Sequence, residues 1–278
     1  LFGYDLGSHP PAVTEPPLPE TPTAVLLLRP CDVAGLRALD AVMRWDYQDE
    51  TYEARRRSAL LVSLGCLEAP NPESCFCRSA GVDPSWAPEA DVHIEPLPGG
   101  RLYHVYGLTE AGNAALAGAA RPVAEGRAAP STAAVPEIDL AGARAWMRDH
   151  FEDPLWREIS EACLGCGACA YVCPSCHCFD MVDQGDWRRG RRVRNWDSCQ
   201  FGHFTAHASG HNPRPEQWNR YRQRVYHKFQ YYPDKFERLL CTGCGRCIEA
   251  CPAGIDLIEV LQSLAAAGRT ERPAPAAS

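Results

Sequence analysis

Two runs of cysteines in this 278-residue chain have the spacing of iron–sulfur ligands. The runs at 163–174 and 241–252 both read C-x2-C-x2-C-x3-C-P. A cubane of iron and sulfide needs four thiolates around a compact core, and cysteines at i, i+3 and i+6 let one loop wrap three of its corners. The glycines between the cysteines permit close approach of the backbone. Each run therefore predicts three ligands of a [4Fe–4S] cluster.

The fourth cysteine of each run predicts cross-ligation. In ferredoxins with two clusters, the cysteine before the proline ligates the cluster of the other run. We therefore expect one cluster on Cys163, Cys166, Cys169 and Cys251, and a second on Cys241, Cys244, Cys247 and Cys173. Zinc also takes four thiolates, but zinc knuckles use two C-x2-C pairs and have no use for the further cysteines of these runs. Iron–sulfur clusters are favoured over zinc.

A third group of cysteines lies in the first half of the chain. Cys31 and Cys66 each follow a predicted strand, and Cys75 and Cys77 lie in a nearby loop bounded by prolines. Neighbouring strands of a sheet can bring their carboxyl ends to one edge, where ligand sites of α/β proteins form. We predict a third [4Fe–4S] cluster on these four cysteines. A zinc site and unliganded thiols are the alternatives.

Three further cysteines, Cys176, Cys178 and Cys199, complete the fifteen. Because eight ligands already satisfy two cubanes, we interpret these three as packed thiols or as thiols that support the clusters. The alternative is that Cys176 or Cys178 replaces Cys173 as a ligand.

Basic residues gather between the two cysteine runs. Five arginines lie within 188–194, and further basic residues follow at Arg220, Arg222, Arg224, His227 and Lys228. An oxidised cubane with four thiolates is a local dianion, so nearby arginines lower the cost of its burial and shift its potential. We interpret this segment as support for the clusters and as a docking site for a partner. The net charge of −7 argues against nucleic-acid binding.

Three histidines in the same region have helical spacing. His203, His207 and His211 stand at i, i+4 and i+8. No carboxylate or cysteine completes a metal site at that spacing, so surface or packed histidines are the favoured interpretation.

The hydrophobic pattern predicts an α+β fold, in which a mixed α/β domain precedes a mainly helical domain of the dicluster ferredoxin type. We expect strands at 24–28 and 59–64, both buried, and a hairpin at 92–106 that turns at 98–100. Helices are expected at 32–42, 109–120, 139–151 and 256–266, and from 154 toward 163. The predicted domains are an extended proline-rich segment at 1–23, an α/β domain at 24–120, a linker at 121–137, the dicluster domain at 138–268 and a flexible tail at 269–278.

Composition restricts the class of protein. With 45% hydrophobic and 23% charged residues the chain is typical of globular proteins, and its apolar runs are too short to cross a membrane, so we expect a cytoplasmic location. It has no dinucleotide fingerprint, phosphate loop or nucleophile motif. A chain with clusters and no other cofactor site relays single electrons, which requires a source and a sink on other chains.

Several short motifs, in the same order, resemble the iron–sulfur β subunit of soluble group 3 NiFe hydrogenases, the sulfhydrogenases. They are LRPCD at 28–32, CFC at 75–77, CPSCHCFD at 173–180, DSC at 197–199 and ASGHNPR at 208–214. That family is similar to the electron-transfer subunit of anaerobic sulfite reductase. The resemblance implies three [4Fe–4S] clusters, a helical-ferredoxin C-terminal half, and a position between a flavoprotein that handles NAD(P)H and a catalytic partner.

We therefore expect a non-catalytic electron-transfer subunit of an oxidoreductase complex, with a soluble NiFe hydrogenase as its first interpretation. The electron-transfer subunit of an anaerobic sulfite reductase is the alternative. A free dicluster ferredoxin or an iron–sulfur sensor is less favoured, because neither needs the large N-terminal domain.

Overall fold

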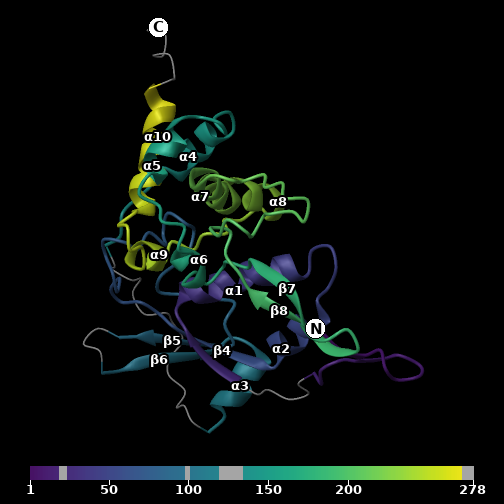
Figure 1. Cartoon of the computed structure of the whole chain (residues 1–278). Coiled ribbons are helices and arrows are strands. Elements are labelled where there is room, and N and C mark those ends of the chain that lie inside the picture. Colours follow the sequence, from purple (N-terminus) through teal and green to yellow (C-terminus); the bar gives the residue numbers. More distant parts are fainter. Residues whose placement is uncertain (19–23, 98–100, 119–133, 271–278) are drawn as a thin grey trace.

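The computed structural model of the chain describes residues 1–18, 24–97, 101–118 and 134–270 (Figure 1). One half of the molecule holds a sheet with helices around it, and the other half is built mainly of helices. The predicted α+β class is thereby confirmed for the described residues.

The N-terminal half is organised around a four-stranded sheet with the order β3-β4-β5-β6. Its strands are Ala24–Leu28, Ala59–Leu64, Val92–Pro96 and Tyr103–Gly107. β3, β4 and β5 are parallel, and β6 pairs with β5 in the antiparallel direction. The connection from β3 to β4 runs through helices α1 (Pro30–Met43) and α2 (Glu50–Arg57), so both strands end at the same edge of the sheet.

The first strand of this sheet is more exposed than its composition predicts. β3 lies at the edge, and the side chains of Val25 and Leu27 are 68% and 67% exposed. An edge strand has a neighbouring strand on one side only. Within β3, Leu28 packs against the small core around Val33 and Leu61. The predicted strand is confirmed, but its predicted burial is wrong.

Polar side chains cap the helices near the predicted starts. Thr109 and Asp139 each accept a hydrogen bond from a backbone N–H in the first turn of α3 (Glu110–Leu116) and α4 (Leu140–Met147). Both helices are shorter than predicted. Of the predicted linker, 134–137 holds no regular structure, and its remainder lies outside the described residues, as do the turn at 98–100 and the tail from 271.

Helices of the C-terminal half enclose the main core. Trp156, Phe229 and Leu261 are fully buried in it. The elements of this half are α5 (Leu155–Ser160), α6 (Ala168–Tyr171), α7 (Gln217–Tyr226), the π-helical turn η1 (His227–Tyr231), α8 (Tyr232–Phe236), α9 (Arg246–Glu249) and α10 (Leu257–Thr270). Because α10 continues to Thr270, the first two residues of the predicted tail belong to this helix.

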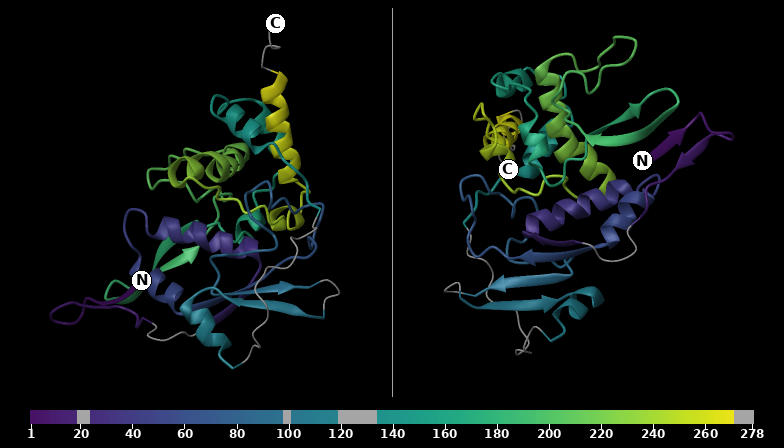
Figure 2. Two further views of the ribbon diagram at one scale, coloured as in Figure 1. Left: turned by 180° about the vertical axis from the view of Figure 1, so that it is seen from behind. Right: turned by 60° about the horizontal axis from the view of Figure 1, so that its bottom comes forward.

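A second sheet, which the sequence did not predict, projects from the side of the molecule (Figure 2). It has the antiparallel order β2-β1-β8-β7, with strands Ala12–Thr14, Phe2–Asp5, Arg189–Trp196 and Phe179–Gly185. Because β1 pairs on both sides, the prediction of a merely extended segment at 1–23 is wrong for 2–5 and 12–14. The prolines fall outside these strands, so they leave the hydrogen-bond ladders intact. None of the residues in β7 and β8 is buried.

Candidate functional site

The two cysteine runs fold in the same way. Each forms a loop with two glycines at positive φ, followed by a one-turn helix, α6 in the first run and α9 in the second. Gly165 and Gly167 have φ of 66° and 78°, and Gly243 and Gly245 have φ of 63° and 76°. Residues with a Cβ rarely adopt this conformation, so glycine lets the loop curl and present three thiols to one side.

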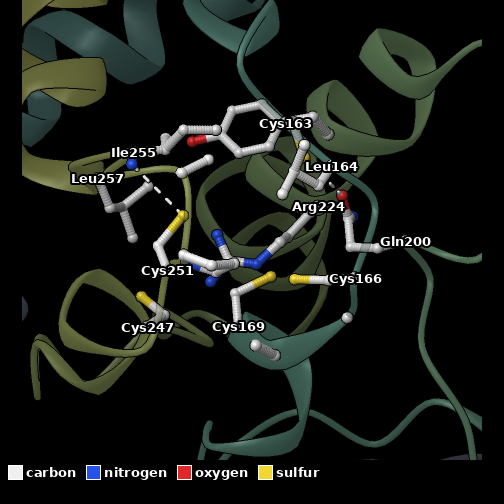
Figure 3. Close-up of a pocket in the computed structure, with 15 residues that line it drawn as sticks. Cys163, Leu164, Cys166, Cys169, Gln200, Arg224, Cys247, Cys251, Ile255 and Leu257 are labelled. Atoms are coloured by element: carbon white, nitrogen blue, oxygen red, sulfur yellow. Dashed lines mark hydrogen bonds between the residues drawn. The ribbon is translucent and has the colours of Figure 1, made fainter.

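The first predicted ligand set converges on one cavity (Figure 3). The thiols of Cys163, Cys166, Cys169 and Cys251 all line it, and Cys247 joins them. The Cys251 Sγ accepts a hydrogen bond of 3.3 Å from the backbone N–H of Ile255. One side of this cavity reaches the surface, because Cys166 is exposed and the neighbouring Leu164 is 72% exposed. The cross-run contact that the sequence predicts is thus present in the structure.

The second predicted set lies between two cavities. Cys173 is close enough to Cys241 and Cys244 to act on both electrostatically. Cys247 lines the first cavity, whereas Cys244 lines the cavity of the N-terminal cysteines. Burial raises the pKa of Cys241 to about 12, so this thiol is protonated at neutral pH unless a metal takes the place of its proton.

The N-terminal cysteines also come together. Cys31, Cys66, Cys75 and Cys77 line a cavity of about 240 Å³ together with Arg29 and Arg246. Cys31 and Cys66 follow the parallel strands β3 and β4, which end at one edge of the sheet. Burial raises the pKa of Cys31 and Cys66 and brings that of Cys77 to about 11. The four cysteines of the third predicted set therefore surround one cavity, as the ligands of one cluster would.

Direct contacts join the N-terminal cysteine loop to the second run. The backbone N–H of Phe76 donates to the carbonyl of Gly243 at 2.8 Å, and Asp32 pairs with Arg246. Gly243 and Gly245 leave no room for a side chain, because a Cβ on either would lie within 2.7 Å of backbone atoms of this loop. The second and third cysteine sets consequently abut across the boundary between the two halves.

Two fully buried cations lie among the thiols. The guanidinium of Arg224 reaches into the first cavity (Figure 3), and the Nζ of Lys228 donates to the Cys173 Sγ at 3.2 Å. Burial alone lowers the pKa of such groups, but the surrounding thiolates hold the pKa of both well above the ordinary value. The Nε and Nη2 atoms of Arg224 have no hydrogen-bond partner in the structure.

These features test whether iron–sulfur clusters fit the site. Two buried guanidinium nitrogens of Arg224 have no acceptor in the structure, and a cubane dianion in the cavity would supply one. Within the described part of the chain, no three His, Cys, Asp or Glu side chains are grouped closely enough to hold a single metal ion. The wider spacing of the thiols suits a larger metal–sulfur group, so the residues fit.

The remaining cysteines form two close contacts. Cys176 hydrogen-bonds to Cys173 and lowers the pKa of that thiol, and a hydrogen bond from Cys178 lowers the pKa of Cys199 to about 6. Two thiols in hydrogen-bond contact are too close to occupy two corners of one cubane. Their interpretation as supporting thiols remains a prediction.

The basic segment divides into two parts with different surroundings. The five arginines at 188–194 lie on or beside the exposed strand β8, away from the cysteine cavities, so their predicted role in cluster support is wrong. Arg224 and Lys228, by contrast, lie against the thiols. Docking of a partner is the interpretation that stays open for these five arginines.

Of the two predicted settings for the histidines, surface or packed, the structure shows the first. His203, His207 and His211 are all exposed, on a segment of turns rather than on a helix.

Polar residues to which the sequence assigned no role also contact the cysteines. The amide Nε2 of Gln217 donates to the Cys163 Sγ at 3.2 Å, and the hydroxyl of Ser175 lies 3.3 Å from the Cys173 Sγ. The side chain of Gln200 accepts from Gln217 and so orients it. Sequence reasoning missed these residues, because glutamine and serine occur at every kind of surface and only the fold brings them to the thiols.

Comparisons with known proteins agree with this geometry. Residues 162–255 match the family model of the 4Fe-4S dicluster domain. The chain is similar to the β subunit of sulfhydrogenase 2 from Pyrococcus furiosus, with 32% identity over 247 residues, which cover 84% of this chain and 71% of that protein. No solved structure matches the chain. Among the helices described, none has the length and apolar character needed to span a bilayer.

Proposed function

The chain belongs to the family of the sulfhydrogenase β subunits, and on that premise we propose that it relays single electrons through three [4Fe–4S] clusters between two partner subunits. The observation that carries this proposal is the sharing of cysteines between cavities. Cys247 borders the first cavity and Cys244 borders the cavity of the N-terminal cysteines, so the middle ligand set adjoins both other sets. An electron relay needs such a continuous series of sites, in which each is next to its neighbour.

The proposed ligand sets are those that the motifs predict. The first is Cys163, Cys166, Cys169 and Cys251, the second is Cys241, Cys244, Cys247 and Cys173, and the third is Cys31, Cys66, Cys75 and Cys77. A bound cluster supplies a site that takes up and gives back one electron. The protein's own contribution is to hold the thiols, to exclude water from the inner sets, and to donate hydrogen bonds to sulfur from Ile255, Gln217 and Lys228.

The order of the sites follows from their contacts. The N-terminal set abuts the second run through the Phe76–Gly243 hydrogen bond, and the second run abuts the first through Cys247. Electrons therefore pass between the first and third sets through the middle one. The exposed Cys166 end is the natural contact for one partner, and the N-terminal cavity is the contact for the other.

The proposed partners are a flavoprotein that handles NAD(P)H and a catalytic hydrogenase subunit. No group in the proposed sites acts on a substrate, so the chain serves as a non-catalytic component of the complex. Contacts between the halves support this function over that of a free ferredoxin, because they build the third ligand set onto the dicluster half.

The test is to purify the chain with its partners without oxygen. Iron and acid-labile sulfide analysis is expected to give about twelve of each per chain, since each cubane holds about four. Copurification with a flavoprotein and hydrogen-dependent reduction of NAD(P)+ are expected. A chain that binds about eight irons contradicts the third cluster, whereas sulfite-dependent oxidation of NAD(P)H without hydrogen activity assigns it to the sulfite reductase alternative. A stable monomer with full iron content contradicts the relay between subunits.

A further inference from the structure

Helix α7 and the π-helical turn η1 carry two positive charges into the interior of the dicluster half. Arg224 is 4% exposed and Lys228 is 2% exposed, and they stand four residues apart on the same side of the helix. Among the residues that the structure describes, neither forms an ion pair with a carboxylate. A buried cation without a carboxylate needs another source of negative charge.

The thiols that face these two cations belong to different ligand sets. Arg224 interacts most strongly with Cys169 of the first set and Cys247 of the second. Lys228 interacts with Cys173 and Cys241, both of the second set. Each also faces Cys176, which belongs to neither set. The guanidinium therefore lies between the two sets, whereas the ammonium belongs to the middle set alone.

The hydrogen bonds of the two cations support the same assignment to the thiol sets. Lys228 directs its ammonium to the Cys173 Sγ at 3.2 Å and to the Ser175 Oγ at 3.4 Å. Arg224 keeps two buried nitrogen atoms, Nε and Nη2, without any acceptor, and its side chain lies among the thiols of the first cavity in Figure 3. Those donors face the space that cluster sulfur would fill.

We propose that Arg224 and Lys228 set the reduction potentials of the first and second clusters, Arg224 acting on both and Lys228 on the second alone. This inference rests on the proposed function, since it takes the two cysteine sets to hold clusters. Reduction adds one electron to a cubane that is already anionic with its thiolates, and no bond is made or broken. A nearby cation stabilises the reduced form and so raises the potential.

Stabilisation of the reduced form by a cation matters most at the middle cluster. Its site is enclosed on both sides, and burial disfavours the more highly charged reduced form. Lys228 offsets this penalty at the one cluster through which every electron passes. The two cations therefore raise the potential of the middle site.

The experiment is a potentiometric titration of the complete complex without oxygen, followed by electron paramagnetic resonance. Lys228→Gln is expected to lower the midpoint potential of one cluster by the equivalent of at least a tenfold change in equilibrium constant, about 59 mV for one electron. Arg224→Gln is expected to lower two midpoints. Arg222→Gln is the matched control, because Arg222 is buried on the same helix but bonds to Phe151 and Glu152 instead of facing thiols.

Variants that keep the positive charge serve as controls for a loss of the fold. Lys228→Arg and Arg224→Lys are expected to retain iron and to leave the midpoints within a few-fold of the unmodified complex. Unchanged midpoints in both glutamine variants with intact signals overturn the inference, as does a tenfold shift in Lys228→Arg. Absence of cubane signals from the unmodified complex counts instead against the proposed function.

Discussion

At the scale of single residues, the glycines of the second cysteine run serve two purposes. They adopt positive φ so that the loop can curl, and they let the N-terminal loop approach closely enough for Phe76 to bond to Gly243. Gly254, a few residues further on, has the same conformation with open space around it. The chain therefore offers a comparison that separates backbone strain from loss of contact.

Gly243→Ala is expected to disrupt the third cluster. A Cβ would lie 2.6 Å from the backbone of Phe76, so the N-terminal loop must move away. We expect a loss of roughly 2–5 kcal/mol in the free energy of unfolding from strain and overpacking, and of about four irons per chain. Gly254→Ala carries the strain of positive φ alone, so it is expected to cost about 1–2 kcal/mol and to keep its iron. Equal iron loss in the two variants would contradict the assigned contact.

A partly buried histidine makes stability depend on pH. Burial, with the nearby His177 and Lys228, lowers the pKa of His227 to about 4, whereas the unfolded chain takes up this proton near the ordinary value of 6.5. The unfolded state therefore binds more protons as the pH falls, and this contribution to stability is complete above pH 6.5 and is lost toward pH 4.

His227→Gln is expected to remove that dependence. The fall in the free energy of unfolding between pH 7 and pH 5 should become smaller by roughly 1–2 kcal/mol, as measured by denaturant unfolding without oxygen. The exposed His203→Gln is the control, and we expect its pH dependence to match that of the unmodified chain. A parallel decline in His227→Gln would show that the ring is not protonated differently in the folded and unfolded states.

At the scale of elements, the hairpin of β7 and β8 lines neither of the two cysteine cavities described above. None of its residues is buried, and the ion pair between Arg194 and Asp49 at 2.7 Å ties it to the N-terminal half. Alternation along the strands places Phe179, Met181 and Trp196 on one face, in line with the pairing of β7 and β8. This hairpin carries the five arginines at 188–194 that stand out in the sequence.

Replacing residues 181–194 with Asn-Gly is expected to leave the clusters intact. The two-residue turn closes a shortened hairpin between Asp180 and Asn195, which already pair. Iron content should not change, and copurification of the partner subunits should weaken. Loss of iron would show that the hairpin supports the clusters, and undiminished copurification would exclude it as a docking element.

Sequence patterns predicted some elements better than others. Strands β3 and β4 and the caps at Thr109 and Asp139 lie where local signals place them, because apolar runs and capping residues act over a few positions. The sheet of β1, β2, β7 and β8 was missed, because it pairs strands nearly 190 positions apart and buries no side chain that would produce an alternating pattern. The convergence of cysteines followed from their spacing, whereas Gln217 reaches the Cys163 thiol, 54 positions away, only through the fold.

At the scale of the whole molecule, the cysteine runs connect distant parts of the chain. Cys251 lies with the first run and Cys173 with the second, so the segment between them is closed at both ends by the proposed clusters. Metal binding of this kind contributes directly to folding, because each of these two proposed clusters joins thiols from both runs.

Cys247→Ser is expected to loosen a region far away in sequence. Loss of the second cluster should raise hydrogen exchange around Cys173 as well as around Cys247, since the two share the proposed ligand set. Cys176→Ser, a change within the same motif as Cys173 but outside the ligand sets, should keep the cluster. Iron analysis and hydrogen exchange check both variants, and two intact cluster signals in Cys247→Ser would contradict the ligand assignment.

The exposed position of Cys166 and Leu164 has a consequence for the lifetime of the complex. Dioxygen and other small oxidants meet this rim first, because Cys166 is exposed whereas Cys241 and Cys173 are only partly exposed. Damage in air should therefore begin at the outermost cubane and leave the inner one whole. Such a molecule could be repaired from the outside by fresh iron and sulfide, without having to unfold.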